Sequence, residues 1–284
     1  MSIGHWQFEP SQLVPVIALA LAYAMRARTL RRKRRPVSLR RRVSFGAGIA
    51  VLVLALVSPL DWYGEHRLLW VHMIQHLLLG DLAPLLIVLG VSGAVLRPVL
   101  AVPVLRRLRG LAHPLVALPL WIVDLYVWHL PVLYQAALEH DQTIHPLEHI
   151  CFFAFGALMW AAVVEPLPGP VWFSAGWKCV YTLAVRVAEA ILANVFIWAQ
   201  TPFYGYYVAR EHGAAAAVSD QRIAGLVMFI EGSLITLLAT SWLFLRFIRE
   251  AEIRQRLIEH DVDATVAARA ARRGGQGRAR ELSR

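Results

Sequence analysis

The sequence predicts an all-α fold, a polytopic membrane helical bundle of about seven transmembrane helices, followed by a short basic tail. Two observations carry this prediction. The 284 residues are 58% hydrophobic and only 17% charged, which is more apolar than a soluble domain of this length. The apolar residues also come in blocks of about 20, long enough to cross a hydrocarbon layer of about 30 Å.

The predicted spans follow the apolar blocks in order. They lie at Leu13–Met25, Val43–Leu60, Leu68–Gly90, Ala112–Leu133, Leu147–Val164, Trp177–Ala199 and Ile223–Ile248. Residues 1–248 therefore form one seven-span membrane domain. Residues 249–284 form a cytoplasmic Arg-rich tail, in which Arg249–His260 continues as a helix and the stretch from Ala264 onward is disordered.

Individual blocks carry features that predict their ends and bends. The first block is short and stops at a cluster of ten Lys and Arg residues over Arg26–Arg42. It is not predicted to be a cleavable signal peptide, because its positive charge follows the apolar stretch. Pro84 interrupts the third span, and Pro114, Pro119 and Pro131 interrupt the fourth. Such prolines free backbone carbonyls and bend helices, which is common around polar cavities in membranes.

The basic residues predict the orientation. Together with Lys178, the segments Arg26–Arg42, Val91–Gly110 and the tail from Arg246 hold 25 of the 29 Lys and Arg residues on one side. Basic loops stay cytoplasmic, so the N-terminus is predicted outside and the C-terminus in the cytoplasm. These residues lie beside span ends, without a basic domain interleaved with aromatic residues. They are therefore predicted to contact anionic lipid, and no nucleic acid is expected as a partner.

Two histidine pairs are the strongest functional signal. His72 and His76 lie in the third span, and His145 and His149 open the fifth. The i, i+4 spacing places both imidazoles of a pair on one side of a helix, one turn apart. Imidazole is the commonest transition-metal ligand, and four histidines at membrane depth are costly unless they are used. The pairs therefore predict a four-histidine metal site.

The topology places this site on the outer side of the membrane. Nine of the eleven histidines are predicted on the outer side or in the outer half of a span: His5, His66, His72, His76, His129, His140, His145, His149 and His212.

Two neighbouring side chains bear on the identity of the metal. Met73 follows His72, and a thioether beside imidazoles favours copper. Met73 nevertheless lies about 100° around the helix from His72 and need not share its coordination sphere. His129, near the outer end of the fourth span, is a further candidate ligand. Copper is therefore predicted at His72, His76, His145 and His149, with Met73 and His129 as secondary metal ligands.

Other interpretations of the same residues stay open. Both pairs are also compatible with histidines that only hydrogen-bond within the bundle. His145–His149 reads H-x-x-E-H, the inverse zinc-protease pattern, in which Glu148 is the general base. That pattern leaves the third span unexplained, and Glu148 is equally suited to orienting a histidine that binds metal.

Charged residues near mid-depth point to a second function class. Asp81, Asp124, Glu189, Glu231 and Arg186 each cost about 2.5–3.5 kcal/mol unless paired or neutralised. One interpretation is polar packing between helices. The other is a path for cations or protons that leads inward from the histidines.

Several motifs together resemble the caa3-type cytochrome c oxidase assembly factor family, named CtaG in Gram-positive bacteria. The resembling segments are His72–His76, Ala83-Pro84, Gly90, Trp128–Pro131, His145–His149 with Gly156 and Trp160, and Asp220–Met228. The sequence departs from the family pattern at Phe229–Gly232, where a Trp-x-Pro-Gly-like motif is expected. The resemblance implies a seven-span protein of the bacterial inner membrane that supports maturation of a haem–copper oxidase, at its copper-loading step.

The predicted function is therefore a membrane assembly factor that binds copper at its outer face and hands it to haem–copper oxidase subunits. No substrate is transformed, so the protein is not expected to be an enzyme. Two alternatives remain. A copper or cation transporter would continue the path through Asp81, Asp124 and Glu189, and a b-type haem membrane protein would use histidines from two helices as axial ligands.

Overall fold

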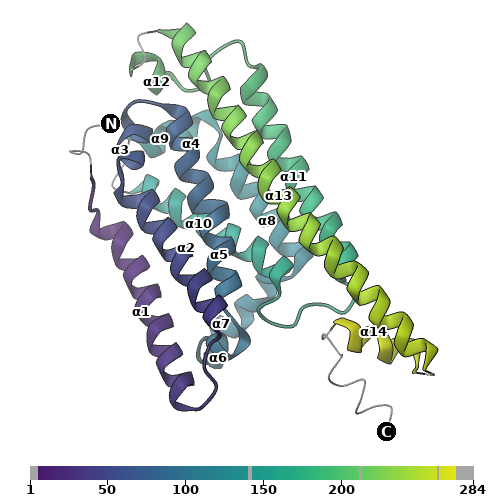
Figure 1. Cartoon of the computed structure of the whole chain (residues 1–284). Helices are drawn as coiled ribbons and strands as arrows, with labels where there is room; N and C mark the ends of the chain where they lie inside the picture. The colour runs from purple at the N-terminus through teal and green to yellow at the C-terminus, as the bar shows by residue number, and fades with distance from the viewer. Residues whose placement is uncertain (1–5, 140–142, 211–212, 261, 273–284) are drawn as a thin grey trace. The chain divides into compact units, whose positions relative to one another are not determined.

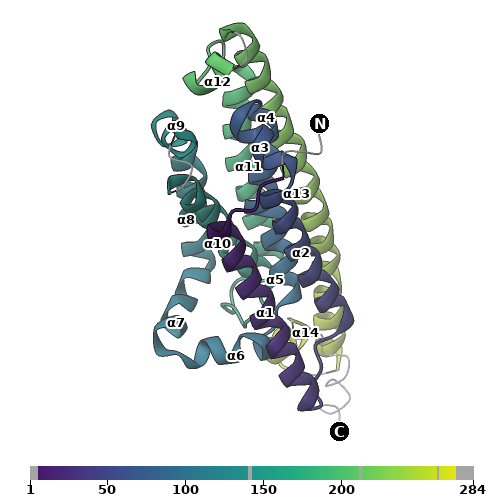
Figure 2. The ribbon, with the colours of Figure 1, turned by 90° about the vertical axis from the view of Figure 1, so that its left-hand side faces the viewer.

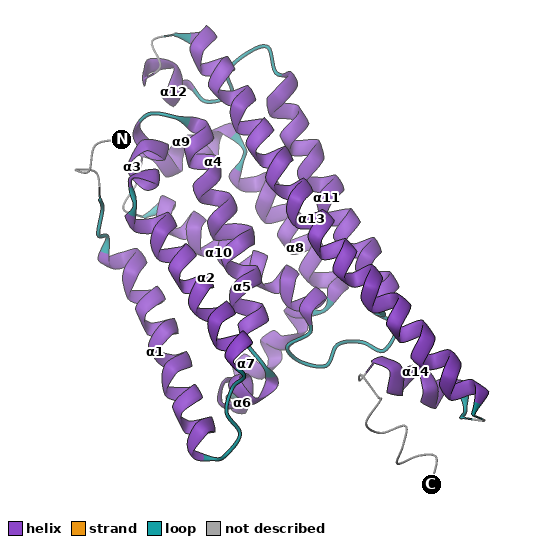
Figure 3. Ribbon diagram, viewed as in Figure 1, coloured by secondary structure: helices purple, strands orange, loops and turns teal. Residues whose placement is uncertain are grey.

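The computed structural model describes residues 6–139, 143–210, 213–260 and 262–272, and within these residues the chain forms helices and no strands (Figures 1 and 3). Five helices are long and apolar enough to cross a membrane, and seven if each of two bent helix pairs counts as one span. The predicted all-α, polytopic membrane fold is confirmed. His5, His140 and His212 lie outside the described residues.

The chain divides into two compact units, the first built from residues 1–169 and 187–232 and the second from residues 170–186 and 233–284. Helices α11 (Ala175–Trp198) and α13 (Ala214–Glu259) each contribute to both units. The other helices of the first unit are α1 (Pro10–Arg32), α2 (Leu39–Val57), α3 (Pro59–His66), α4 (Leu69–Leu77), η1 (Leu78–Leu82), α5 (Ala83–Gly90), α6 (Gly93–Ala101), α7 (Pro103–Leu108), η2 (Arg109–Ala112), α8 (Pro114–Trp128), α9 (Pro131–Glu139), α10 (Ile144–Val164) and α12 (Gly205–Arg210). Figures 1 and 2 place α3, α9 and α12 at one end of this unit and α6 and α7 at the other.

Two predicted spans are bent, the second where no interruption was predicted and the fourth at a proline that was predicted to interrupt it. The second span breaks at Ser58 into α2 and α3, at an angle of 45°. Ser58 accepts a hydrogen bond from the Leu60 N–H, and Pro59 occupies the first turn of α3, so a new helix starts there. The fourth span breaks between α8 and α9 by 69°, where Pro131 starts the second helix.

The third span contains one turn of π-helix. It runs as α4, η1 and α5, and the Ala83 N–H donates to the Leu78 carbonyl, five residues back. Pro84 has no N–H to donate to Gly80, four residues earlier, which explains why the regular pattern of hydrogen bonds changes here. The turn begins at Leu78, two residues after His76. Single π-turns of this kind are frequent beside functional sites.

Helix α10 crosses this turn at close range. A Cβ atom built on Gly156 would lie 2.9 Å from the carbonyl carbon of Gly80 and closer still to its oxygen. Only a residue without a side chain permits that approach between backbones, as in small-residue contacts of membrane helices. Nearby, the Trp160 indole donates a hydrogen bond to the Asp81 carboxylate. The approach of α10 to the third span is therefore set by glycines and by a buried polar contact.

The C-terminal part of the chain contains one more helix than expected. Helix α13 continues to Glu259, and residues Ala264–Arg272 form a further helix, α14, where disorder was expected. Asp263 accepts hydrogen bonds from the N–H groups of Thr265 and Val266, which caps this helix. The Arg272 guanidinium donates to the carbonyls of Pro170, Val171 and Phe173 within the second unit. Capping and these bonds account for the helix.

Candidate metal centre

The four histidines of the two predicted pairs form one buried cluster in the first unit. One ring nitrogen from each of His72, His76, His145 and His149 lies within 4.8 Å of those of the other three. The ring centroids are 4.2 Å and 4.1 Å apart within the α4 and α10 pairs. Across the two helices they are 5.4 Å apart for His72 and His145, and 5.7 Å for His76 and His149. No side chain of the four is more than 5% exposed.

Each pair keeps its geometry because it lies in the first turns of a helix whose start is held in place. Helix α4 begins at Leu69, whose N–H donates to the carboxylate of Asp220 on α13. This carboxylate satisfies a backbone donor that the start of any helix leaves free. In α10, Pro146 lies in the first turn, where its missing N–H costs nothing.

The Nδ1 atoms of three of the histidines are held by hydrogen-bond acceptors. His145 Nδ1 lies 2.8 Å from a Glu65 carboxylate oxygen, and His149 Nδ1 lies 3.2 Å from the Gln12 amide oxygen. His72 Nδ1 lies 3.1 Å from the Tyr207 hydroxyl oxygen. That hydroxyl donates its own proton to the Gly64 carbonyl at 2.7 Å, so it accepts from His72. All three rings therefore carry a proton on Nδ1, which leaves Nε2 as the atom available to bind an ion.

The other ring nitrogens of the four histidines make no hydrogen bond within the part of the chain that the structure describes. Among the described residues, the Nε2 atoms of His72, His145 and His149 and both nitrogens of His76 are buried without a hydrogen bond. Buried polar atoms in folded proteins are almost always paired, so a cluster of unpaired lone pairs needs a ligand to explain it. A ring that donates through one nitrogen and leaves the other free is the usual arrangement of a metal-binding histidine.

The size of the cluster fits a transition-metal ion. Imidazole nitrogens bind such ions at about 2.0–2.1 Å, which places tetrahedral ligands about 3.4 Å and opposite ligands about 4.2 Å apart. The 4.8 Å limit of the cluster lies just above these separations. Small side-chain shifts therefore suffice to close the four imidazoles on one ion.

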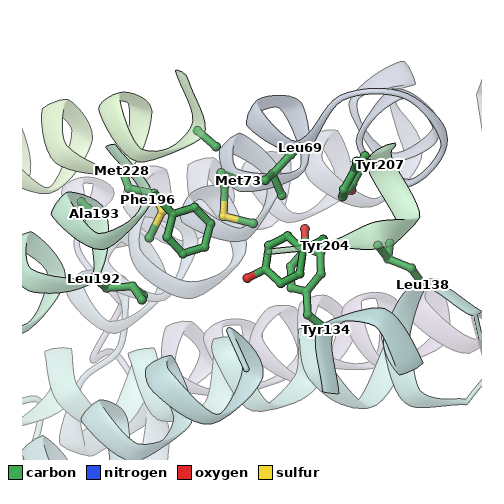
Figure 4. Close-up of a cluster of buried hydrophobic side chains, with 11 residues drawn as sticks. Leu69, Met73, Tyr134, Leu138, Leu192, Ala193, Phe196, Tyr204, Tyr207 and Met228 are labelled. Atoms are coloured by element: carbon green, nitrogen blue, oxygen red, sulfur yellow. The ribbon is translucent and has the colours of Figure 1, made fainter. Parts of the chain in front are cut away.

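The two secondary candidates lie outside this group of four. Met73 is buried in an apolar cluster with Tyr204, Phe196 and Met228, as Figure 4 shows. The ring of His129 is 6.4 Å from that of His76, and its Nδ1 donates to the Leu125 carbonyl at 2.7 Å. The structure therefore brings together four of the six predicted ligands.

Several residues that the sequence did not single out support the site. Glu65, Gln12 and Tyr207 orient its histidines from α3, α1 and α12. The Gln75 amide donates to the Asp61 carboxylate and to the Ala55 carbonyl, and so ties α4 to α2 and α3. In the sequence, only the position of Gln75 between the two histidines of an apolar helix hints at such a supporting role.

Two of the acids near mid-depth in the first unit, Asp81 and Asp124, have hydrogen-bond donors of their own. Asp81 accepts from Trp160, and the Asp124 carboxylate is paired with the Trp128 indole one turn later. Both contacts join a carboxylate to a tryptophan and satisfy it within the bundle, which favours the packing interpretation of these residues.

The structure weighs against two of the open interpretations. A protease needs a cleft for its peptide, whereas the Glu148 side chain is only 1% exposed. A haem needs space between its axial ligands, whereas the Phe152 ring lies 4.7 Å from His76 and the Tyr134 ring 5.4 Å from His72. The cluster has room for an ion but not for a macrocycle.

Comparison with known families agrees with the motifs that surround this cluster. The family model of the cytochrome c oxidase caa3 assembly factors (Caa3_CtaG) matches residues 21–250, which include all six predicted ligands. The chain belongs to this family. The resemblance predicted from the histidine motifs and from Asp220–Met228 is thereby confirmed.

Similarity to individual proteins is weaker. Two curated relatives, uncharacterized proteins of Mycobacterium bovis and Mycobacterium tuberculosis, are each 26% identical to this chain over 183 residues. The alignment covers 58% of this chain and 27% of each relative, so the chain spans about a quarter of their length. No solved structure matches the chain.

Proposed function

We propose that this Caa3_CtaG protein assembles a haem–copper oxidase by binding copper at His72, His76, His145 and His149 and handing it to an oxidase subunit. The observation that carries the proposal is the buried group of four imidazoles with unpaired nitrogens, described above. Imidazole binds copper in either oxidation state, so the donor set fits this cargo. Membership of an oxidase assembly family supports an oxidase subunit as the recipient of this cargo.

The protein's part in this process is to bind the copper ion, to hold the histidine rings in place for it, and to release it. Glu65, Gln12 and Tyr207 hold three rings through Nδ1 and leave Nε2 available to the ion, so little ordering is needed on binding. Glu65 also provides a route to the surface, because its side chain is 12% exposed while it touches the buried His145. The ion enters and leaves beside α3, and no covalent chemistry is required of the protein.

The orientation of the protein decides which side of the membrane is served. Helices α4 and α10 carry the site near their first residues, at the end where Figure 1 places α3, α9 and α12. With the basic clusters facing the cytoplasm, this end faces the exterior of the bacterial inner membrane. Cargo is then delivered on the outer side, and the basic residues contact anionic lipid on the inner side.

Copper binding is tested by elemental analysis of the purified full-length protein, carrying an affinity tag without histidine. Wild-type protein loaded with copper is expected to retain it, whereas His72→Ala and His149→Ala lose most of it. His260→Ala is the matched control, because this exposed ring lies just beyond the end of α13, where it bonds the Arg256 carbonyl. Equal copper contents in all four proteins would remove the site assignment.

The assembly role is tested separately in cells. Deletion of the gene is expected to leave the oxidase short of copper and of activity, and the His149→Ala gene is expected to fail to restore either. An oxidase that keeps its copper and activity after deletion would refute the role. Copper uptake into vesicles separates handover from transport, because an assembly factor binds copper without net flux.

A further inference from the structure

We propose that Glu148 is a fifth ligand of the histidine cluster and that the site therefore takes its cargo as Cu2+ in preference to Cu+. The inference rests on the proposed function, since it concerns the same copper site. It adds a residue to the site and names the chemical form of the cargo.

The Glu148 carboxylate is buried and lacks hydrogen-bond donors among the described residues. Glu148 lies on α10 between His145 and His149, and its side chain is 1% exposed. Neither of its two carboxylate oxygens has a hydrogen-bond partner among the described residues. A buried carboxylate without donors is strongly unfavourable, so its place in the fold needs a cation or a donor that the protein itself does not supply.

The Glu148 carboxylate lies close enough to the histidine cluster to share an ion with it. A Glu148 carboxylate oxygen lies 3.9 Å from His76 Nε2. This separation is too long for a hydrogen bond, which closes to about 2.7–3.2 Å. Two atoms that each lie about 2.1 Å from one ion are about 3.0–4.2 Å apart, depending on the angle between them. The carboxylate and the His76 ring are therefore spaced as two ligands of one ion.

The candidate ligands among the described residues are nitrogen and oxygen donors and include no sulfur. Met73 is buried in the apolar cluster of Figure 4, and the group of four ligands contains no cysteine. Cys151 follows His149 by two residues, about 200° around α10, and so faces away from it. Soft sulfur ligands favour Cu+, whereas a set of imidazole nitrogens and a carboxylate oxygen favours Cu2+. Among divalent first-row ions such donors bind Cu2+ most tightly.

The acids around the cluster favour an ion of higher charge. Two carboxylates contact its histidines, Glu148 beside His76 and Glu65 through its bond to His145. A third buried carboxylate, Asp61 of α3, interacts electrostatically with His145. A buried site is most stable when the charge that it encloses is neutralised, and these acids neutralise a dication more completely than they would suit a monocation.

The experiment compares the affinities of the two copper forms in full-length protein reconstituted in lipid nanodiscs. Cu2+ is titrated against nitrilotriacetate, and Cu+ against bathocuproine disulfonate under reducing, anaerobic conditions. Glu148→Gln keeps the shape and removes the charge. It is expected to lower the affinity for Cu2+ by about 10-fold to 100-fold, the range seen when support of a metal site is removed, with little change for Cu+. Its Cu2+ form is expected to show an altered electron paramagnetic resonance spectrum.

Two further variants separate a ligand from a merely structural residue. Glu148→Asp keeps a carboxylate and is expected to recover part of the Cu2+ affinity. Glu65→Gln is the matched control, because it removes the acid that orients His145 and should weaken Cu2+ and Cu+ binding alike. An unchanged Cu2+ affinity and spectrum in Glu148→Gln, or an equal loss for both ions, would overturn the proposal while leaving the four-histidine site intact. Wild-type protein that binds neither ion would overturn the copper function itself.

Discussion

The replacement Gly156→Ala tests whether the close crossing of α10 and the third span holds the metal centre together. The Cβ added at this position would lie 2.9 Å from the carbonyl carbon of Gly80 and 3.3 Å from Pro84 Cγ. Both neighbours belong to the stretch that includes η1 and the start of α5, where the backbone is tied into a helix and cannot rotate away as a side chain would.

The size of the effect follows from these distances. Non-bonded carbon atoms rest at about 3.5–4.0 Å, so the two helices must separate by about 1 Å at the crossing. Overpacking of this kind costs about 1–3 kcal/mol of unfolding free energy. His149 precedes Gly156 by seven residues, about two turns, and so shares its face of α10. The ligand nitrogens, now within 4.8 Å of one another, would move apart by a comparable distance, and copper affinity should fall with stability.

The assay measures unfolding in sodium dodecyl sulfate by tryptophan fluorescence and copper content by elemental analysis, on the same preparations. Gly46→Ala is the matched control, because a Cβ built on Gly46 of α2 meets no atom within 4 Å. It is expected to match wild type in both measurements. If Gly156→Ala is as stable as Gly46→Ala and holds as much copper, the crossing does not have the geometry described.

Three further replacements test individual contacts. Tyr207→Phe removes the acceptor of the His72 Nδ1 proton and should lower copper affinity by about 10-fold to 100-fold in a competition titration, so an unchanged affinity would show that this ring is oriented by something else. Trp160→Phe leaves the Asp81 carboxylate without its indole donor and should cost about 1–3 kcal/mol of stability. Copper content should remain, and its loss without a loss of stability would favour the cation path over packing. His129→Ala should retain copper at the wild-type ratio, since this ring lies outside the group of four, and a halved ratio would return it to the ligand set.

Much of the site was predictable because its signal is local. The four-residue spacing of His72 and His76, and of His145 and His149, settles which side of its own helix each ring occupies, whatever surrounds that helix. The length of the apolar blocks likewise predicts helices, since a backbone in hydrocarbon must satisfy its own hydrogen bonds. Proline predicted that the fourth span is interrupted, but not that Pro131 starts a new helix at 69° to the first.

The residues that orient the rings were not predictable in this way. Tyr207 is 135 residues from His72 in sequence, and Gln12 is 137 residues from His149. Neither has a spacing or a motif that links it to a histidine. The secondary candidates illustrate the same limit, because Met73 adjoins a ligand in sequence and yet packs among apolar side chains.

The amino-acid sequence alone was enough to predict a bundle of apolar helices, paired imidazoles on two of them, and a resemblance to a family of oxidase assembly factors. These properties depend on composition, on helical periodicity and on short motifs. It took the folded chain to show that the two pairs meet, that Glu65, Gln12 and Tyr207 bond to the Nδ1 atoms of three rings, and that Glu148 is enclosed with them. Those facts depend on how closely helices approach, which here depends on glycines such as Gly156 and on contacts between residues more than a hundred positions apart.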